Sequence, residues 1–197
     1  IPDAFEFLRL GIGKPVERLR LATGVLIGPQ HSAVMLAKRL ATLDALSGGR
    51  LQVGIGIGWQ REEYAAVGVP YRSRGRRLDE SIDAMRILWR EDPASFTGDF
   101  VRFERVFCDT KPAQSRGVPL HIGGSSEAAA RRAGLRGDGF FPYVISPEDL
   151  GLMKFVDDPQ PGWRPPQPIC QLTYASGSSV ISPSISRATR SPSAWAR

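Results

Sequence analysis

Two short runs of small residues could hold a ligand through bare main chain. In GIGIG, residues 54–58, glycines alternate along a β-type run, and a strand face without Cβ atoms lets a flat ring approach the backbone closely. In GGSS, residues 123–126, main-chain N–H groups at the start of a helix and two hydroxyls would suit a phosphate. Each run also has a plain structural interpretation. Small residues relieve crowding inside a sheet, and one serine suffices as a helix cap.

The sequence offers few other groups for catalysis. A dinucleotide-binding fingerprint, GxGxxG, would need glycine where the chain has Trp59 or Arg61, so that motif is absent. His31, after a predicted strand, is an acid–base candidate or an ordinary polar loop residue. His121, within a short strand, either contacts a cofactor or fills the core. We assign neither histidine to catalysis, and the catalytic residues stay unknown.

Composition narrows the class of protein. The 197 residues are 42% hydrophobic and 23% charged, which is typical of a soluble globular domain, and neither an apolar span nor a signal peptide is evident, so we expect a cytoplasmic protein. Cys108 and Cys170 lie far apart without metal-ligand spacing, so we expect neither a disulfide nor a metal site. The net charge is +6, but its densest cluster, residues 72–77, precedes an acidic pair, which indicates a solvated face rather than a nucleic-acid stripe.

Strand-like and helix-like segments alternate along the chain. Strands are expected at residues 19–27, 50–59, 118–126 and 137–144, helices at 33–46, 76–90 and 127–136, and a hairpin at 95–103. Ser32 and either Ser125 or Ser126 are candidate helix caps. This alternation predicts an α/β protein with a parallel sheet, whose ligands bind at the carboxyl ends of the strands.

Several ordered segments resemble one family. Residues 18–71, 74–103 and 121–141 resemble the luciferase-like monooxygenases, in particular the branch that uses coenzyme F-420, a deazaflavin. The stretch IPDAFEFL, residues 1–8, also resembles that family, and the likeness covers about residues 1–150. It implies a partial TIM-type (β/α)8 barrel, because a whole barrel needs about 250 residues. The first and the last units are expected to be missing.

The resemblance also implies a cofactor site. Its expected residues are Thr23, Gly24 and Val25 beneath the ring, often with a non-proline cis peptide, Gly56, Ile57 and Gly58 beside it, and Gly123, Gly124, Ser125 and Ser126 at the phosphate. Trp59 then either lines the substrate pocket or is a buried anchor for the following loop. The cofactor would supply most of the chemistry.

Three functional hypotheses follow. The first is an oxidoreductase that transfers hydride with coenzyme F-420, or a monooxygenase that uses FMN, acting on a small organic molecule. The second is a non-catalytic flavin-binding protein. The third, suggested by the charge and the C-terminal composition, is a basic fragment that binds nucleic acid or membranes. We favour the first, with no nucleic-acid or membrane partner, and the substrate cannot be read because loops determine it.

The chain divides into two regions. Residues 1–150 are the expected partial barrel, in which Gly11, Gly13 and Pro15 disfavour the first helix. Residues 151–197 are a Pro/Ser-rich tail, without Asp or Glu from position 159 onward, that we expect to lack packed structure. With barrel units missing, we expect weak or absent activity and association into homo-oligomers through exposed sheet edges.

Overall fold

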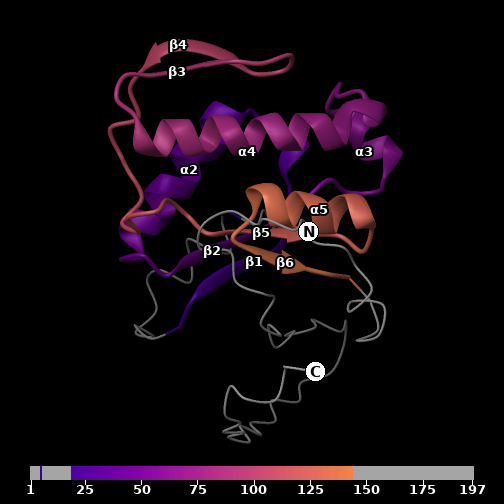
Figure 1. Ribbon diagram of the computed structural model, residues 1–197, viewed down its shortest axis with the longest axis horizontal. Helices are drawn as coiled ribbons and strands as arrows, with labels where there is room; N and C mark the ends of the chain where they lie inside the picture. The colour runs from indigo at the N-terminus through magenta and orange to yellow at the C-terminus, as the bar shows by residue number, and fades with distance from the viewer. Residues whose placement is uncertain (1–4, 6–18, 144–197) are drawn as a thin grey trace, which may run out of the picture.

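Four parallel strands form the sheet of this protein (Figure 1). The computed structural model describes residue 5 and residues 19–143. The strands are β1 (Leu21–Ile27), β2 (Leu51–Gly56), β5 (Leu120–Gly123) and β6 (Gly139–Phe141). They lie in the order β1-β2-β5-β6, so each strand pairs with the next sheet strand along the chain. This order is that of an arc of a TIM-type barrel, whereas a doubly wound sheet reverses direction at a switch point. The predicted α/β fold is confirmed.

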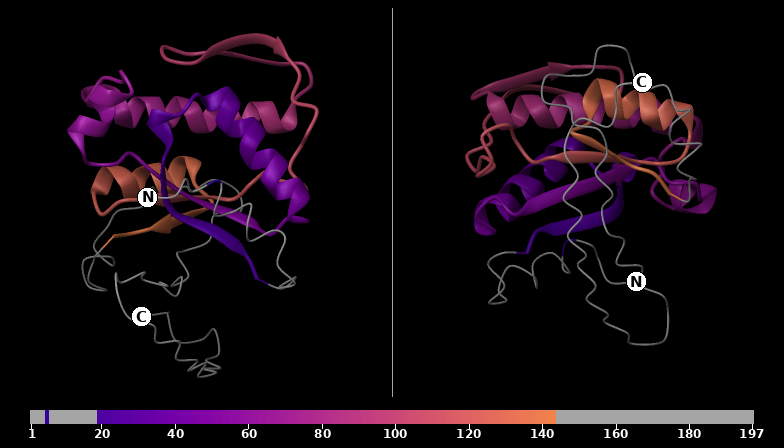
Figure 2. Two further views of the ribbon diagram at one scale, coloured as in Figure 1. Left: turned by 180° about the vertical axis from the view of Figure 1, so that it is seen from behind. Right: turned by 60° about the horizontal axis from the view of Figure 1, so that its bottom comes forward.

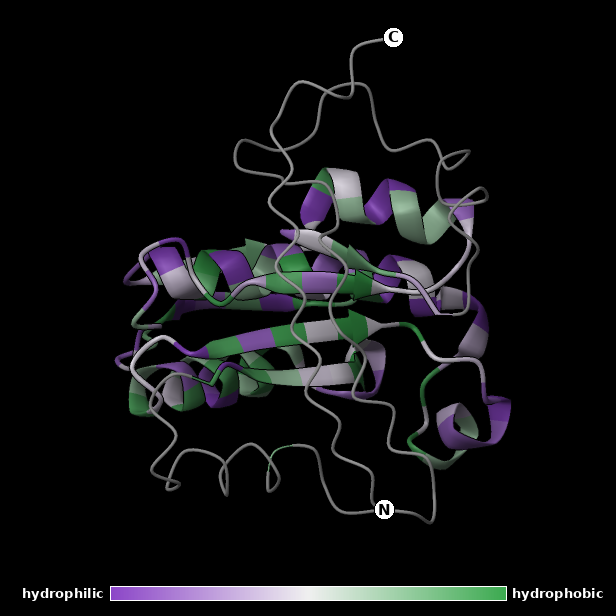
Figure 3. Cartoon of the chain, turned by 90° about the horizontal axis from the view of Figure 1, so that it is seen from below, coloured by the Kyte–Doolittle hydropathy of each residue, from purple (hydrophilic) through white to green (hydrophobic). Residues whose placement is uncertain are grey.

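Three helices cover one face of this sheet (Figures 1 and 2). They are α2 (Ala33–Leu46), α4 (Arg74–Arg90) and α5 (Glu127–Arg136). In β2 the side chains of Leu51, Val53 and Ile55 are fully buried in the core that these helices complete. Because successive strand residues face opposite sides, Gly54 and Gly56 lie on the other face. Figure 3 shows hydrophobic and less hydrophobic residues alternating along strands of the sheet.

Short elements and a hairpin connect these units. The short helices are η1 (Gly28–Gln30), α3 (Arg61–Ala66) and η2 (Tyr71–Ser73). Helix η1 follows the carboxyl end of β1, α3 follows that of β2, and η2 lies between α3 and α4. The antiparallel strands β3 (Ala94–Thr97) and β4 (Arg102–Val106) run along α4 (Figure 1). Within the described residues, no helix is both long enough and apolar enough to cross a membrane.

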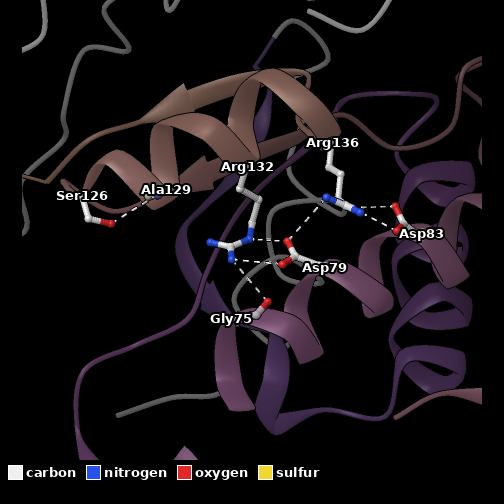
Figure 4. Close-up of polar contacts among 7 residues, drawn as sticks. All are labelled: Gly75, Asp79, Asp83, Ser126, Ala129, Arg132 and Arg136. Atoms are coloured by element: carbon white, nitrogen blue, oxygen red, sulfur yellow. Dashed lines mark hydrogen bonds and ion pairs between the residues drawn. The ribbon is translucent and has the colours of Figure 1, made fainter. Parts of the chain in front are cut away.

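A ladder of ion pairs fixes α5 against α4 (Figure 4). Arg132 Nε lies 2.6 Å from Asp79 Oδ1, and Arg136 Nε lies 3.0 Å from Asp83 Oδ2. The Arg132 side chain is only 10% exposed, which places its pair with Asp79 in a partly dehydrated environment. These contacts hold in place the helix whose N-terminus carries the predicted phosphate turn.

The basic cluster at residues 72–77 is more than the solvated face that we expected. The guanidinium groups of Arg76 and Arg77 lie over the Phe100 ring at 5.1 and 4.5 Å from its centre. The Glu80 carboxylate accepts hydrogen bonds from the main-chain N–H groups of residues 99–101 at 3.0, 2.7 and 3.1 Å. The cluster therefore takes part in holding the hairpin tip against the start of α4.

Most predicted elements are confirmed to within a few residues. The exception is α3, a helix of six residues that the sequence patterns did not reveal. Gly48 and Gly49 follow α2 with φ of 65° and 79°, a left-handed conformation that favours glycine at the end of a helix. The first helix, which Gly11, Gly13 and Pro15 disfavour, and the Pro/Ser-rich tail lie outside the described residues. The predictions about these two segments stay predictions.

Candidate functional site

Strand β1 is interrupted by a bulge at its pairing with β2. The register shifts between Thr23 and Leu26, and the peptide bond between Gly24 and Val25 is cis, as the family resemblance implied. The Thr23 hydroxyl donates a hydrogen bond to the Gly54 carbonyl at 2.8 Å. A Cβ atom at Gly54 would lie 2.2 Å from the Thr23 carbonyl oxygen, a distance that no side chain can tolerate. Glycine at 54 is therefore required by the close approach of two main chains.

The bulge places the Val25 side chain across the neighbouring strands. Cβ atoms at Gly54, Gly56 and Gly123 would lie 3.1, 3.2 and 2.8 Å from a methyl carbon of Val25. The missing side chains thus make room for an isopropyl group of this same chain. The crowding interpretation accounts for these three glycines. A ring above them would meet Val25 first, in the layer where Thr23, Gly24 and Val25 were expected to support it.

The alternation of glycines does not extend to Gly58. Strand β2 ends at Gly56, and Gly58 lies beyond it with φ of 64°. A Cβ atom at Gly58 would lie 3.1 Å from Cγ2 of Ile27, at the end of β1. The prediction that Gly54, Gly56 and Gly58 share one face is therefore wrong for Gly58, because the chain turns after residue 56.

Two tyrosines fix the exit of β2. The Tyr64 hydroxyl donates to the Ile57 carbonyl at 2.5 Å, and the Tyr71 hydroxyl donates to the Trp59 carbonyl at 3.0 Å. Burial raises the pKa of Tyr64 to about 12, so its hydroxyl keeps its proton at neutral pH. Sequence reasoning missed both tyrosines. Their only signal was an aromatic residue on either side of a Gly-Val-Pro turn.

Trp59 itself is open to solvent. Its side chain is 80% exposed, so the interpretation of Trp59 as a buried anchor is wrong. Its main chain, by contrast, is held by Tyr71. Trp59 follows the carboxyl end of β2, the end of the strands at which parallel barrels bind their ligands.

The GGSS turn joins β5 to α5. Ser126 is the helix cap, since its Oγ accepts a hydrogen bond from Ala129 N at 3.2 Å (Figure 4). The Ser125 hydroxyl is engaged with the main chain of Tyr143, accepting from its N–H at 3.0 Å and donating to its carbonyl. Gly124 has φ of 131°, a conformation that favours glycine. Both serine hydroxyls thus have partners within the chain.

Main-chain N–H groups at the start of α5 have no acceptor in the part of the chain that the structure describes. None of the residues in the described range 19–143 accepts a hydrogen bond from the N–H groups of Ser126, Glu127 and Ala128. These groups lie at the positive end of the helix dipole, which favours an anion. The Glu127 side chain, in the first turn, opposes a second negative charge there. The phosphate prediction therefore depends on main-chain N–H groups more than on the serine hydroxyls.

The two histidines lie in different surroundings. His31 follows η1 and lines a cavity of about 340 Å³ between the start of α2 and the hairpin tip, together with Arg77 and Phe100. His121 lies in β5 in register with Gly54 and Gly139, and burial lowers its pKa. Its Nε2 is buried and has no hydrogen-bond partner among the described residues. Among the described residues, no group of three or more His, Cys, Asp or Glu side chains could hold a metal ion.

Known proteins are similar to this chain in sequence. The chain is 36% identical over 148 residues to an uncharacterized protein of Mycobacterium tuberculosis, covering 74% of this chain and 51% of that protein. It is 38% identical over 145 residues to the FMNH2-dependent dimethylsulfone monooxygenase of Pseudomonas putida, covering 72% of this chain and 39% of the enzyme. The chain thus spans about half the length, or less, of these curated relatives.

Solved structures share the fold. Monooxygenase RslO1 from Streptomyces bottropensis matches with a TM-score of 0.68 and 28% identity, over 77% of this chain and 47% of that one. An F-420-dependent secondary alcohol dehydrogenase, solved with an F-420–acetone adduct, matches with a TM-score of 0.67 and 26% identity, over 76% and 46% of the two chains. The sequence profile of the luciferase-like monooxygenases matches residues 15–153. This chain belongs to the luciferase-like monooxygenase family.

Proposed function

We propose that this chain forms one wall of a flavin-type cofactor site in an oxidoreductase that acts on a small organic molecule. The observation that carries the proposal is the low floor formed by Val25, Gly56 and Gly123 where three parallel strands end. Because the glycines let the Val25 side chain lie close to the main chain, the floor is apolar and has no protruding side chain from residues 56 and 123. A planar ring can rest on such a surface.

The adjoining helix start suits the phosphate of the same cofactor. Gly123 ends β5, and the N–H groups at the start of α5 that have no acceptor within residues 19–143 begin three residues later, at the cap Ser126. Three residues span at most roughly 10 Å. This spacing is compatible with the sugar-alcohol chain that joins a flavin-type ring to its phosphate. Floor and helix start would therefore be occupied by one molecule.

The residues of this chain would bind and orient the cofactor. Val25 would support the ring, and the main chain at residues 126–128 would hold the phosphate. When bound, the cofactor supplies hydride transfer or, in its FMN form, the reduction of dioxygen. We assign no proton transfer to His31 or His121.

We place coenzyme F-420 first and FMN second. The F-420-dependent alcohol dehydrogenase shares the fold at 26% identity, which supports a deazaflavin. The FMNH2-dependent dimethylsulfone monooxygenase is 38% identical, which supports FMN and monooxygenation. Both cofactors carry a phosphate beyond the sugar-alcohol chain, so the site described here accommodates either.

Binding titrations test this proposal. The purified chain is titrated with F-420, FMN and riboflavin, and binding is followed by quenching of ligand fluorescence. If α5 holds the phosphate, FMN binds at least about tenfold more tightly than riboflavin, which lacks that group, corresponding to about 1.4 kcal/mol. Equal affinities for FMN and riboflavin would refute the phosphate site, and no binding of FMN or F-420 would refute the function.

A matched pair of variants isolates the helix start. Glu127→Gln removes the negative charge in the first turn of α5 and should tighten FMN binding several-fold at low salt, while riboflavin binding stays unchanged. Glu104→Gln, on the exposed surface of β4, removes the same charge elsewhere and should change neither affinity. An equal effect of the two substitutions would show that net charge, rather than the helix start, governs binding.

A further inference from the structure

Each outer strand of the parallel sheet has one unpaired edge within the described residues. There, β1 pairs only with β2, and β6 pairs only with β5. Unpaired strand edges offer main-chain donors and acceptors to another strand, and natural proteins rarely leave them open. In a closed barrel every strand has two neighbours, so no edge remains. The two edges are therefore the places where further strands would join this sheet.

The face of the sheet that turns away from the helices is uncharged. No Asp, Glu, Lys or Arg occurs in β1, β2, β5 or β6. Ala22 lies on this face, in register with Gln52, and its side chain is exposed. A sheet face that meets water usually carries polar or charged residues at alternate positions. An uncharged face built of glycine, alanine and glutamine is typical of a surface that other protein segments cover.

A buried polar atom on the same face lacks a partner. Leu120 and Ile122 belong to the core under the helices, so the intervening His121 points to the opposite face. Its Nε2 is buried, and none of the described residues forms a hydrogen bond with it. Buried polar atoms in folded proteins nearly always have a partner. We therefore expect a polar group from outside the described part of the chain to face His121.

The length of the chain limits what can close the sheet. A barrel has eight strands in about 250 residues, so four further strand–helix units need roughly 125 residues. Outside the described ranges the chain has only residues 1–4, 6–18 and 144–197, which are too few for four units. A second copy of the chain, by contrast, supplies four parallel strands in the same order.

We propose that two copies of this 197-residue chain close one eight-stranded barrel. A two-fold axis along the barrel places β6 of each copy beside β1 of the other, and all eight strands then run in the same direction. This arrangement pairs both open edges at once and encloses the uncharged face with both His121 side chains. The proposed cofactor floor would then lie opposite a wall from the second copy, although closure of the barrel itself needs no cofactor.

Ala22 allows the seam between the copies to be blocked. The Leu21 N–H donates to the Arg50 carbonyl at 2.9 Å, on the side of β2. Because successive residues of a parallel strand direct their main-chain groups to alternate sides, the Ala22 N–H points to the open edge. Ala22→Pro removes that donor, and Ala22→Glu places a charge on the uncharged face. Neither substitution removes a hydrogen bond between β1 and β2.

Sedimentation equilibrium tests the inference. The wild-type chain should have about twice the mass of one chain, which is 21.5 kDa, with or without FMN. Ala22→Pro and Ala22→Glu should each weaken dimerisation at least about tenfold. Met35→Glu, at an exposed apolar side chain of α2, is the control and should leave dimerisation unchanged. A wild-type monomer at all concentrations, or a dimer that only Met35→Glu weakens, would overturn the inference.

A disulfide assay separates the closed barrel from a dimer joined through β1 alone. Ala22→Cys is made in a Cys170→Ser background, and the native Cys108 is buried. In the barrel the two new thiols lie on opposite walls, too far apart for a disulfide. Pairing of β1 with β1 would bring them near the two-fold axis, so a disulfide-linked dimer on a non-reducing gel would contradict the barrel. If Ala22→Pro and Ala22→Glu do not fold, the wild-type mass and this assay decide.

Failure of this inference can be told apart from failure of the proposed function. A wild-type monomer that binds FMN overturns the closed barrel and leaves the proposed function standing. A dimer that passes both assays and binds neither FMN nor F-420 supports the closed barrel and refutes the proposed function.

Discussion

Replacement of Gly123 by alanine tests whether the glycines of the floor exist to accommodate Val25. The new Cβ atom would lie 2.8 Å from Cγ1 and 3.3 Å from Cγ2 of Val25. Carbon atoms in contact prefer separations of about 3.5–4.0 Å, so the valine side chain must move. Val25→Ala removes both of those methyl carbons. The pair of substitutions therefore forms a double-mutant cycle with a defined contact.

The magnitudes follow from packing. Overpacking of this kind costs about 1–3 kcal/mol of the free energy of unfolding. Val25→Ala alone should cost at most about 1.5 kcal/mol, because it deletes two methyl groups of a half-buried side chain. In the double variant the clash is gone, so its loss should be smaller than the sum of the single losses by about 1–2 kcal/mol.

The assay is urea unfolding followed by far-ultraviolet circular dichroism for the wild type, the single variants and the double variants. Gly54→Ala is the contrasting case, because its Cβ atom would lie 2.2 Å from the Thr23 carbonyl, which Val25→Ala leaves in place. It should cost about 3 kcal/mol or more and keep most of that cost beside Val25→Ala. If the losses of Gly123→Ala and Val25→Ala simply add, the explanation of the glycines is refuted.

Three further predictions concern stability and titration. The Arg132 side chain is 10% exposed and lies 2.6 Å from Asp79, so Arg132→Met should lower the free energy of unfolding by about 1–3 kcal/mol. The Arg76 side chain is 69% exposed, so Arg76→Met should lower it by at most about 1 kcal/mol. Equal losses of the two variants in urea melts would contradict this. Burial lowers the pKa of His121 from 6.5, so the unfolded chain binds a proton that the folded chain resists, and stability should fall as the pH drops below about 6.5. His121→Gln should flatten that slope in urea melts from pH 7.5 to pH 5.5, and an unchanged slope would disprove the assignment. Tyr64→Phe should cost about 1–2 kcal/mol through loss of the hydrogen bond to the Ile57 carbonyl, and should remove a tyrosinate transition near pH 12 from an ultraviolet titration; if the wild-type transition at that pH persists in the variant, it belongs to another tyrosine.

The strand and helix units could be predicted because their signals are local. Alternating apolar residues, glycines after a helix and serines before one act within a few positions, as at Gly48 and Ser126. The short helix α3 was missed because six residues cannot show a helical period clearly. The parallel direction of the strands followed from the alternation of strands and helices, which is again a property of neighbouring segments.

The packing of the site could not be predicted because it depends on residues far apart in sequence. Val25 reaches Gly123 only because β2 brings β1 and β5 together and a bulge turns the valine across the sheet. Likewise, Arg77 meets Phe100 because the hairpin folds back along α4. No pattern in a single sequence shows such long-range contacts. The glycine run therefore looked like a direct ring contact, when its immediate neighbour is a side chain of the same chain.

The floor and the rim of the candidate site should respond differently to substitution, and this difference links the packing to the function. Val25 and Gly123 pack against each other, so a change at either alters the free energy of unfolding and the surface offered to a ring at the same time. The Trp59 side chain is exposed, and its main-chain carbonyl accepts a hydrogen bond that a new side chain leaves intact. Floor variants should therefore change stability and FMN affinity together, whereas Trp59 variants should leave the free energy of unfolding nearly unchanged. A Trp59 variant that unfolds as readily as Gly123→Ala would show that the indole has a packing role, and the division of the site into floor and rim would be wrong.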